Sequence, residues 1–268
     1  MVVLITGASG GLGTVLGSLL SRKGLKVYGT MRNPEGRESD YPFTLLPMEV
    51  NSDESVQACV DEVVEREGRI DVLINCVNQM IIGSVEEQSV EEVQDLFNAN
   101  IFGVMRVCKA VIPVMKKQRG GTIVNMSSLG GILAVPFMSA YTSAKFCLEA
   151  MSEALYYEMK PHNIDVVIMQ PVAMHMDRPA TGSHLRTVKN VPANSRTHKM
   201  VERMAADTAA SKLTPEMVSA KIYEVITSQK KPLRVPMDRA KVMSVVKRLL
   251  PGPMMNKIVL RFMGDVMG

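Results

Sequence analysis

A tyrosine and a lysine stand one helical turn apart in the run from Tyr141 to Lys145, which reads YTSAK. Residues at i and i+4 share one face of a helix, so the phenol and the ammonium point the same way. A free tyrosine titrates near pH 10, whereas a neighbouring cation stabilises the phenolate and lowers that pKa. Lowering it by roughly two to three units takes about 3–4 kcal/mol. The pair therefore predicts a group that exchanges protons near neutral pH.

Two polar side chains upstream fit the same chemistry. Ser128 follows the expected strand 122–126. A hydroxyl at the end of that strand is placed to hydrogen-bond the substrate oxygen whose proton Tyr141 transfers. Asn100 belongs to the run 98–103, which begins a helix that we expect beside this strand.

A glycine-rich turn connects the expected first strand to the helix after it. The run from Thr6 to Gly13 reads TGASGGLG. Its glycines Gly7, Gly11 and Gly13 allow a tight turn and let the backbone approach a pyrophosphate, which the helix N-terminus attracts. Because strand, turn and helix occur together, the run predicts dinucleotide binding rather than a purely structural turn.

The end of the expected second strand indicates which dinucleotide is preferred. An acidic residue there would bind the adenosine ribose and repel a 2′-phosphate. The chain instead reads YGTMR up to Arg32, and this guanidinium is able to pair with that phosphate. NADP(H) is therefore favoured over NAD(H), with a solvated surface arginine as the alternative.

Together these features resemble the short-chain dehydrogenase/reductase family in its compact single-domain branch, over essentially the whole chain. The markers are TGxxxGxG from Thr6, Asn100, Ser128 and YxxxK from Tyr141, in order and at family-like spacing. The resemblance implies that Tyr141 is the general acid/base and that Ser128 polarises the substrate oxygen. It also implies that Lys145 binds the nicotinamide ribose and lowers the pKa of Tyr141, and that Asn100 holds a water of a proton relay.

The resemblance implies further contacts and an oxidoreductase that interconverts a carbonyl and an alcohol. Val50 would contact the adenine through its backbone, and Asn75 would lie alongside the adenosine. The remaining expected cofactor contacts are Ser9, Leu12, Pro171 and Met174. The expected pocket wall consists of Gln79, Met80, Ser128, Phe137, Met138, Tyr141 and Met176.

The substrate class follows from weaker signals. The segment 128–137 is similar to that of hydroxysteroid and retinol dehydrogenases, and the chain holds 22 methionines. A Met-rich interior is adaptable and suits an apolar ligand, although methionine also serves as an ordinary core filler. We therefore expect a lipophilic ketone or alcohol as substrate.

The chain departs from the family pattern in four places. The chain reads NCVN at 75–78 where Asn-Asn-Ala-Gly is usual, and Pro171 is followed by Val172 where Pro-Gly is usual. Met176 stands where a threonine commonly binds the nicotinamide amide, and Glu49 stands where an aspartate is usual. The catalytic set is intact, so chemistry is still expected.

Short apolar runs alternate with longer helical patterns, which predicts a Rossmann-like α/β fold. We expect a doubly wound, mostly parallel seven-stranded sheet with helices on both faces, in three layers. The strands are expected at 2–6, 25–30, 43–48, 72–75, 122–126, 165–169 and 233–235, and the helices near 11–23, 53–68, 89–118, 140–160 and 214–228. Capping chemistry marks two helices, through Ser52 and Gly68 in one and Thr214 with Pro215 in the other.

The chain of 268 residues is expected to form one domain, 1–268. The segment 172–213 lacks clear periodicity and follows the sixth strand, so we interpret it as a substrate lid loop. The segment 238–268 is expected to form basic amphipathic helices. The helices near 98–118 and 141–160 carry apolar residues on more than one side, which in the resembling family builds a homodimer or homotetramer.

Composition limits the class of protein. With 46% hydrophobic and 22% charged residues the chain is neither disordered nor collagen-like. The four cysteines, Cys59, Cys76, Cys108 and Cys147, form no metal-binding spacing, so we expect reduced thiols, no metal and a cytoplasmic protein. No signal peptide, transmembrane span or nucleic acid partner is expected.

The C-terminal segment carries much of the positive charge. Residues 230–268 hold nine basic and two acidic residues, a local +7, whereas the whole chain carries only +4. We favour a helical cap packed on its own domain, with peripheral contact to an anionic membrane as the alternative. Two other functions remain open, a non-catalytic dinucleotide-binding sensor or scaffold and a lipid-modifying dehydrogenase held at a membrane.

Overall fold

A parallel sheet forms the centre of the protein. The structure, a computed structural model, describes residues 1–175 and 185–267. Within these residues the central sheet has seven strands in the order β3-β2-β1-β4-β6-β7-β9, all paired in parallel. The order of strands reverses beside β1, since β2 and β3 lie on one side and β4 on the other. In such sheets ligands bind outside the carboxyl ends of the strands at this reversal.

The strands and helices confirm the predicted Rossmann-like α/β class. The strands of the sheet are β1 (Val2–Thr6), β2 (Lys26–Met31), β3 (Thr44–Pro47), β4 (Val72–Asn75), β6 (Gly121–Met126), β7 (Ile164–Gln170) and β9 (Arg234–Pro236). The helices that cover it are α1 (Gly11–Arg22), α2 (Asp53–Glu67), α3 (Val90–Phe97), α4 (Gly103–Lys117), α5 (Ser139–Met159) and α7 (Pro215–Thr227).

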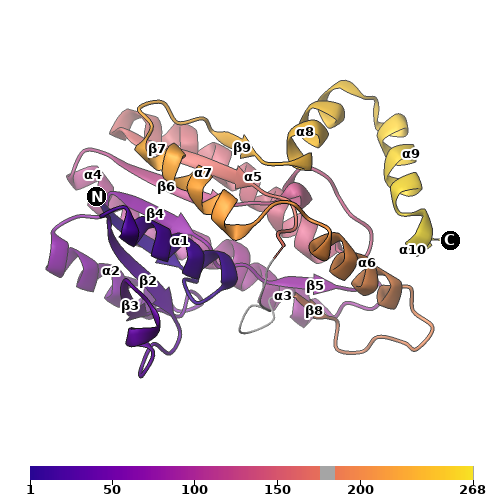
Figure 1. Cartoon of the computed structure of the whole chain (residues 1–268), viewed down its shortest axis with the longest axis horizontal. Coiled ribbons are helices and arrows are strands. Elements are labelled where there is room, and N and C mark those ends of the chain that lie inside the picture. The colour runs from indigo at the N-terminus through magenta and orange to yellow at the C-terminus, as the bar shows by residue number, and fades with distance from the viewer. Residues whose placement is uncertain (176–184, 268) are drawn as a thin grey trace.

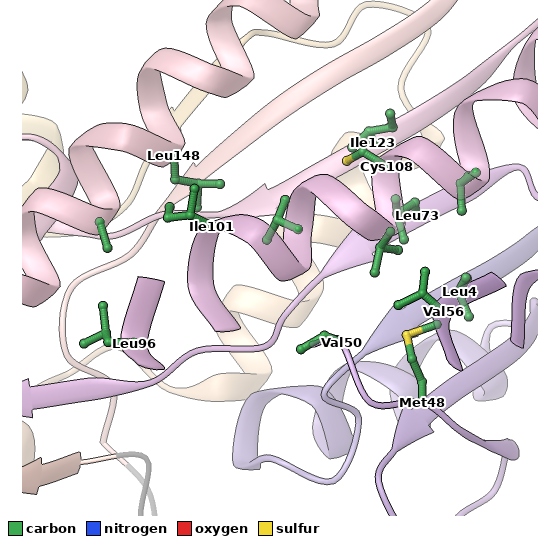
Figure 2. Packing of buried hydrophobic residues seen from close by; sticks show 14 of the residues in the cluster. Leu4, Met48, Val50, Val56, Leu73, Leu96, Ile101, Cys108, Ile123 and Leu148 are labelled. Atoms are coloured by element: carbon green, nitrogen blue, oxygen red, sulfur yellow. The ribbon is translucent and has the colours of Figure 1, made fainter. Parts of the chain in front are cut away.

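Both faces of the sheet are buried, which explains the unbroken apolar runs of its strands. In β1, Leu4 points into a cluster with α2, α4 and α5, whereas Val3 and Ile5 point into a second cluster with α1 and α7. Figure 1 shows α1 and α7 side by side on one face. Figure 2 shows the other face, where Leu4, Leu73 and Ile123 of neighbouring strands meet the helices.

The predicted helix caps are present. The Ser52 side chain accepts a hydrogen bond from Ser55 N at 3.1 Å, and Gly68 ends the same helix with φ +71°. Thr214 accepts from Met217 N at 3.4 Å, with Pro215 as the first helical residue. These local signals were sufficient to locate the helix ends.

The segment 172–213 is not a loop throughout, and this prediction is corrected. Strand β8 (Leu185–Thr187) pairs with β5 (Met80–Ile82) in a separate two-stranded sheet, and α6 (Thr197–Ala209) follows it. Met200 of α6 is buried in the core, although its turn-forming neighbours obscure the periodicity in the sequence. The part of the segment from 176 to 184 lies outside the described residues.

The helix expected over 89–118 is interrupted. A π-helical turn, η2 (Asn98–Phe102), separates α3 from α4 and contains Asn100. Such turns are uncommon and often mark functional sites. Among the described residues, the run 90–117 alone has the length and mean hydropathy of a membrane span, but it packs against α2 and α5 as core helices do.

The C-terminal segment is helical, as expected. Helices α8 (Arg239–Leu249), α9 (Gly252–Phe262) and α10 (Gly264–Met267) form the right-hand edge of the molecule in Figure 1. Arg203 of α6 donates to the carbonyl oxygen of Phe262 at 3.0 Å and pairs with Asp265. One side of the segment therefore packs on the domain as a cap.

Candidate active site

The tyrosine of the YxxxK run lies in the first turn of α5 and is 5% exposed. Its ring packs closely on the backbone that follows β6, because a Cβ at Gly130 would lie 3.1 Å from Tyr141 Cε1. Ser128 lies just before Gly130, with its Oγ accepting from Gly130 N at 3.1 Å. The phenol of Tyr141 hydrogen-bonds with the side chains of Ser128 and Asn78. The structure thus brings the serine and the tyrosine together.

The pKa of Tyr141 is raised above its ordinary value, contrary to the expectation of a lowered one. Burial is the largest cause and raises the pKa, whereas hydrogen bonding with Ser128 and Asn78 lowers it. The expected lowering by Lys145 does not govern the balance, since the ammonium lies 5.6 Å from the ring centroid.

Lys145 is buried beneath the site. Its Nζ donates to the carbonyl oxygen of Met126 at 2.8 Å, and the side chain is 1% exposed. Burial lowers the pKa of this ammonium to about 8, and the electrostatic interactions with Cys76 and Glu149 oppose that effect. Lys145 is therefore poised between its charged and neutral forms near physiological pH.

Asn100 holds the chain that follows β4. Its Oδ1 accepts from Gln79 N at 2.7 Å, and its Nδ2 donates to the carbonyl oxygen of Gln79 at 2.7 Å. Both bonds go to one backbone unit, and the asparagine itself is 1% exposed. Asn100 therefore fixes the position of the peptide next to Asn78.

Asn78 is a site residue to which the sequence patterns gave no role. It stands where the resembling family has glycine, and this departure was the signal available in the sequence. Its side chain hydrogen-bonds with the Tyr141 phenol, while its Oδ1 is buried without a partner among the described atoms. A buried amide oxygen of this kind has an accepting position to offer to a bound molecule.

The glycine-rich turn has the geometry that a pyrophosphate requires. Gly7 has φ +68°, and a Cβ at Gly13 would lie 2.4 Å from the Gly7 carbonyl oxygen. Helix α1 begins at Gly11 with no side-chain cap and no acidic residue in its first turn. The amides and the positive end of the helix dipole are therefore available to an anion. These residues fit a dinucleotide.

The other expected cofactor residues differ in their exposure to solvent and in their hydrogen bonds. Arg32 is exposed directly after β2, so its guanidinium is free to reach a phosphate. Asn75 is buried and donates through Nδ2 to Asn125 Oδ1 at 2.8 Å, so its side-chain amide is already engaged inside the protein. Val50 is also buried, and its carbonyl oxygen accepts a hydrogen bond from Arg106 Nη1 at 3.5 Å.

The remaining cofactor positions frame the same edge of the sheet. Ser9 is partly buried in the turn, whereas Leu12 of α1 packs into the core. Pro171 follows β7, and its carbonyl oxygen accepts from Leu129 N at 2.9 Å. Met174 is partly buried against the α1 and α7 core. The backbone after β7 is thereby attached to the segment that carries Ser128.

The expected pocket residues gather from two segments. Gly83 N donates to the carbonyl oxygen of Phe137 at 2.8 Å, which joins the strand β5 to the approach of α5. Met80 and Phe137 are partly buried, whereas Met138 is 4% exposed and belongs to the core. Gln79 accepts through Oε1 from Arg186 at 2.6 Å. Met176 lies outside the described residues.

No metal site accompanies this arrangement within residues 1–175 and 185–267, where no three His, Cys, Asp or Glu side chains converge. The cysteines in this part of the chain are all free thiols. The described side chains at the site supply a phenol, a hydroxyl, an amide and a buried ammonium.

Comparisons of sequence find relatives of known type. The family model for short chain dehydrogenase matches residues 1–181. A 3-ketodihydrosphingosine reductase of Bacteroides thetaiotaomicron is 42% identical over 170 residues, 63% of this chain and 62% of that protein. Human retinol dehydrogenase 8 is 34% identical over 181 residues, 63% of this chain and 57% of that protein. The aligned part thus spans less than two thirds of either relative.

Comparisons of structure agree on the architecture. A short-chain dehydrogenase from Streptomyces avermitilis superposes with a TM-score of 0.83 at 28% identity, over 99% of this chain and 98% of that one. An enzyme of the same type from Burkholderia phymatum, solved with NAD, gives 0.76 at 20% identity over 92% of both chains. An alcohol dehydrogenase from Thermococcus sibiricus, solved with 5-hydroxy-NADP, gives 0.70 at 20% identity over 88% and 95%. The last two show the fold alone.

Proposed function

The chain belongs to the short-chain dehydrogenase family, and from this premise we propose that it interconverts a carbonyl and an alcohol on a lipophilic small molecule with NADP(H). The observation that carries the proposal is the phenol of Tyr141 hydrogen-bonded with the Ser128 hydroxyl at the carboxyl end of β6. NADP(H), when bound, supplies or accepts the hydride of the reaction.

Proton transfer, cofactor binding and positioning of the backbone are assigned to different residues of this chain. Ser128 and Tyr141 hold the substrate oxygen between a hydroxyl and a phenol, and Tyr141 Oη donates the proton during reduction or takes it up during oxidation. Lys145 and the glycine turn from Gly7 to Gly13 are proposed to bind the dinucleotide, through a ribose and the pyrophosphate respectively. Asn100 positions the adjacent backbone through its two bonds to Gln79.

Two observations support the finer parts of the proposal. Arg32 is exposed at the end of β2 with no acidic residue beside it, which favours a 2′-phosphate and hence NADP(H). A lipophilic substrate is supported by the apolar side chains of Met80 and Phe137 near the site and by the names of the two relatives, a sphingosine-type reductase and a retinol dehydrogenase. We propose that the protein works in the cytoplasm, as its free thiols suggest.

The test is turnover of a panel of long-chain and cyclic ketones and alcohols, followed by the absorbance of reduced nicotinamide with NADPH and with NADH. The variant Tyr141→Phe should lose about 100-fold or more in kcat, because the ring is retained and the proton donor is lost. Its Kd for NADPH should stay the same.

The matched control is Tyr157→Phe, since Tyr157 lies exposed on the same helix and should tolerate the change. Equal loss of cofactor binding and turnover in Tyr141→Phe would contradict the assigned role. Binding of NADPH without turnover of any substrate would favour a sensor or scaffold. A preference for NADH of about tenfold would overturn the argument from Arg32.

A further inference from the structure

We propose that the outer face of α8 and α9 docks on an anionic lipid bilayer. The proposal goes beyond the oxidoreductase function and does not depend on it. It rests on the arrangement of exposed apolar and basic side chains on these two helices, on their net charge and on the way in which their inner side is already packed.

Helix α8 carries an apolar stripe that faces solvent. Val242, Val245 and Leu249 follow the i, i+3, i+7 spacing of one helix face and are 63%, 55% and 74% exposed. Lys241 and Arg248 each precede a stripe residue and flank the stripe along its length. Large aliphatic side chains on one face with cations at its margin are typical of helices that lie in a membrane interface.

Helix α9 repeats the same arrangement. Met254 and Ile258 lie one turn apart on one face and are 52% and 40% exposed. Lys257 and Arg261, also one turn apart, are exposed along the edge of that face. Two consecutive helices thus combine an apolar stripe with a basic margin, which is more than single exposed side chains would produce by chance.

The net charge identifies the partner as anionic. Residues 239–262 contain six basic residues and no acidic one. A second copy of this face would meet it with like charge, so self-association through the stripe is disfavoured. An anionic bilayer offers both an apolar interior for the aliphatic side chains and negative headgroups for the cations.

The opposite side of the two helices is already occupied. Ala240 and Met255 are buried against the domain. Lys247 donates to the carbonyl oxygen of Ile132, and its Nζ lies 4.4 Å from the Phe146 ring centroid. The helices are therefore fixed by their inner side, and the stripes cannot be buried by rotation of either helix without breaking these contacts.

The inner side also borders an apolar groove of about 550 Å³. Its lining includes Leu133 and Phe146 from the domain and Leu250, Met255 and Val259 from the C-terminal helices. Leu133 follows closely after Ser128 in the chain. The groove therefore lies between the C-terminal helices and the segment that follows Ser128.

The experiment is co-sedimentation of the full-length protein with vesicles of phosphatidylcholine alone and of phosphatidylcholine with phosphatidylglycerol. We expect binding to the anionic vesicles only. This binding should be lost at high salt, because salt screens the attraction between the basic side chains and the anionic headgroups. The quadruple variant Lys241→Gln, Arg248→Gln, Lys257→Gln, Arg261→Gln should bind about 100-fold more weakly or worse, since each cation near such a surface contributes about fivefold.

The control removes the same charge elsewhere, in Lys109→Gln, Lys116→Gln, Lys117→Gln, Lys199→Gln, all of which change exposed lysines. It should bind anionic vesicles nearly as well as the unaltered protein. A second variant, Val245→Ser with Leu249→Ser and Ile258→Ser, keeps the charge and should also lose binding. Circular dichroism and the oligomeric state establish that each variant is folded.

Three outcomes would overturn the proposal. They are absence of sedimentation with anionic vesicles, equal sedimentation with neutral ones, and equal loss in the control variant. A fourth, a change from oligomer to monomer in the serine variant without vesicles, would show that the stripe contacts another protein chain instead. NADPH binding measured on the same variants reports separately on the proposed oxidoreductase function.

Discussion

The amide of Asn78 changes the surroundings of the Tyr141 phenol in a way that the glycine of the family pattern does not. A glycine has no side chain to offer, whereas this amide hydrogen-bonds with the phenol and lowers its pKa against the effect of burial. The two hydrogen bonds between the Asn100 side chain and the Gln79 backbone fix the chain next to Asn78. At the scale of single residues, Asn78 partly replaces what Lys145 was expected to supply.

The variant Asn78→Gly should therefore raise the pKa of Tyr141 further. Oxidation of an alcohol requires the phenolate, so its rate rises with pH through this pKa, and the midpoint of the profile should move to higher pH. The measurement is kcat against pH for alcohol oxidation. Asn194→Gly, at an exposed loop position, is the control and should leave the midpoint unchanged. An unchanged midpoint in Asn78→Gly would contradict the claim that the Asn78 amide lowers the pKa of Tyr141.

At the scale of elements, the connection between β1 and α1 is as tight as its backbone allows. A Cβ at Gly13 would meet the Gly7 carbonyl oxygen at 2.4 Å and the Ala8 Cα at 2.8 Å, both of them backbone atoms that cannot turn aside. Val77 closes the turn from the other side, since its backbone and side chain lie 3.1 Å from the place of a Cβ on Gly7. Strand, turn and helix are therefore fitted to one another.

Gly13→Ala should consequently shift α1 away from β1 and weaken NADPH binding more than it weakens the fold. We expect a loss of about 1–3 kcal/mol in the free energy of unfolding, as for other overpacked sites. Chemical denaturation and NADPH fluorescence titration measure the two effects. Gly252→Ala meets no atom within 4 Å and should change neither. Full cofactor affinity in Gly13→Ala would argue against the turn as the pyrophosphate site.

The sequence predicted those elements whose signals are local. Strands with continuous apolar runs, such as β1 and β4, were located to the residue. The helix expected over 53–68 was located to within one residue, since it ends at Glu67 with Gly68 as its cap. Helix α6 was missed because its single buried methionine, Met200, depends on contacts with distant parts of the chain. The contacts of Asn100 with Gln79 are likewise tertiary, and no spacing in the sequence encodes them.

At the scale of the whole molecule, apolar side chains remain exposed on the helices that carry the site. Phe102, the last residue of η2, and Met105 of α4 lie one turn apart and are 49% and 51% exposed. Together they form a patch that is separate from the C-terminal stripes, and a contact between copies of the chain would cover it. We propose that this patch lies in the contact of the homodimer or homotetramer that we expect.

The variant Phe102→Asp with Met105→Asp should shift the protein from that oligomer to a monomer, because it places charge in the contact. Light scattering after size-exclusion chromatography gives the mass. Met217→Asp, which changes an exposed methionine on α7, is the control and should leave the mass unaltered. A monomer before any substitution would refute the oligomer.

The hydrogen bond from Leu129 N to the Pro171 carbonyl oxygen joins the end of β7 to the segment that holds Ser128. Together with the bond from Ser127 N to the Met169 carbonyl oxygen, it transmits displacement at either end to the other. Affinity for the nucleotide and alignment of the reacting oxygen should therefore vary together across variants of this loop. To change nucleotide affinity without disturbing the alignment of the reacting oxygen, the backbone contact between these two segments would first have to be removed.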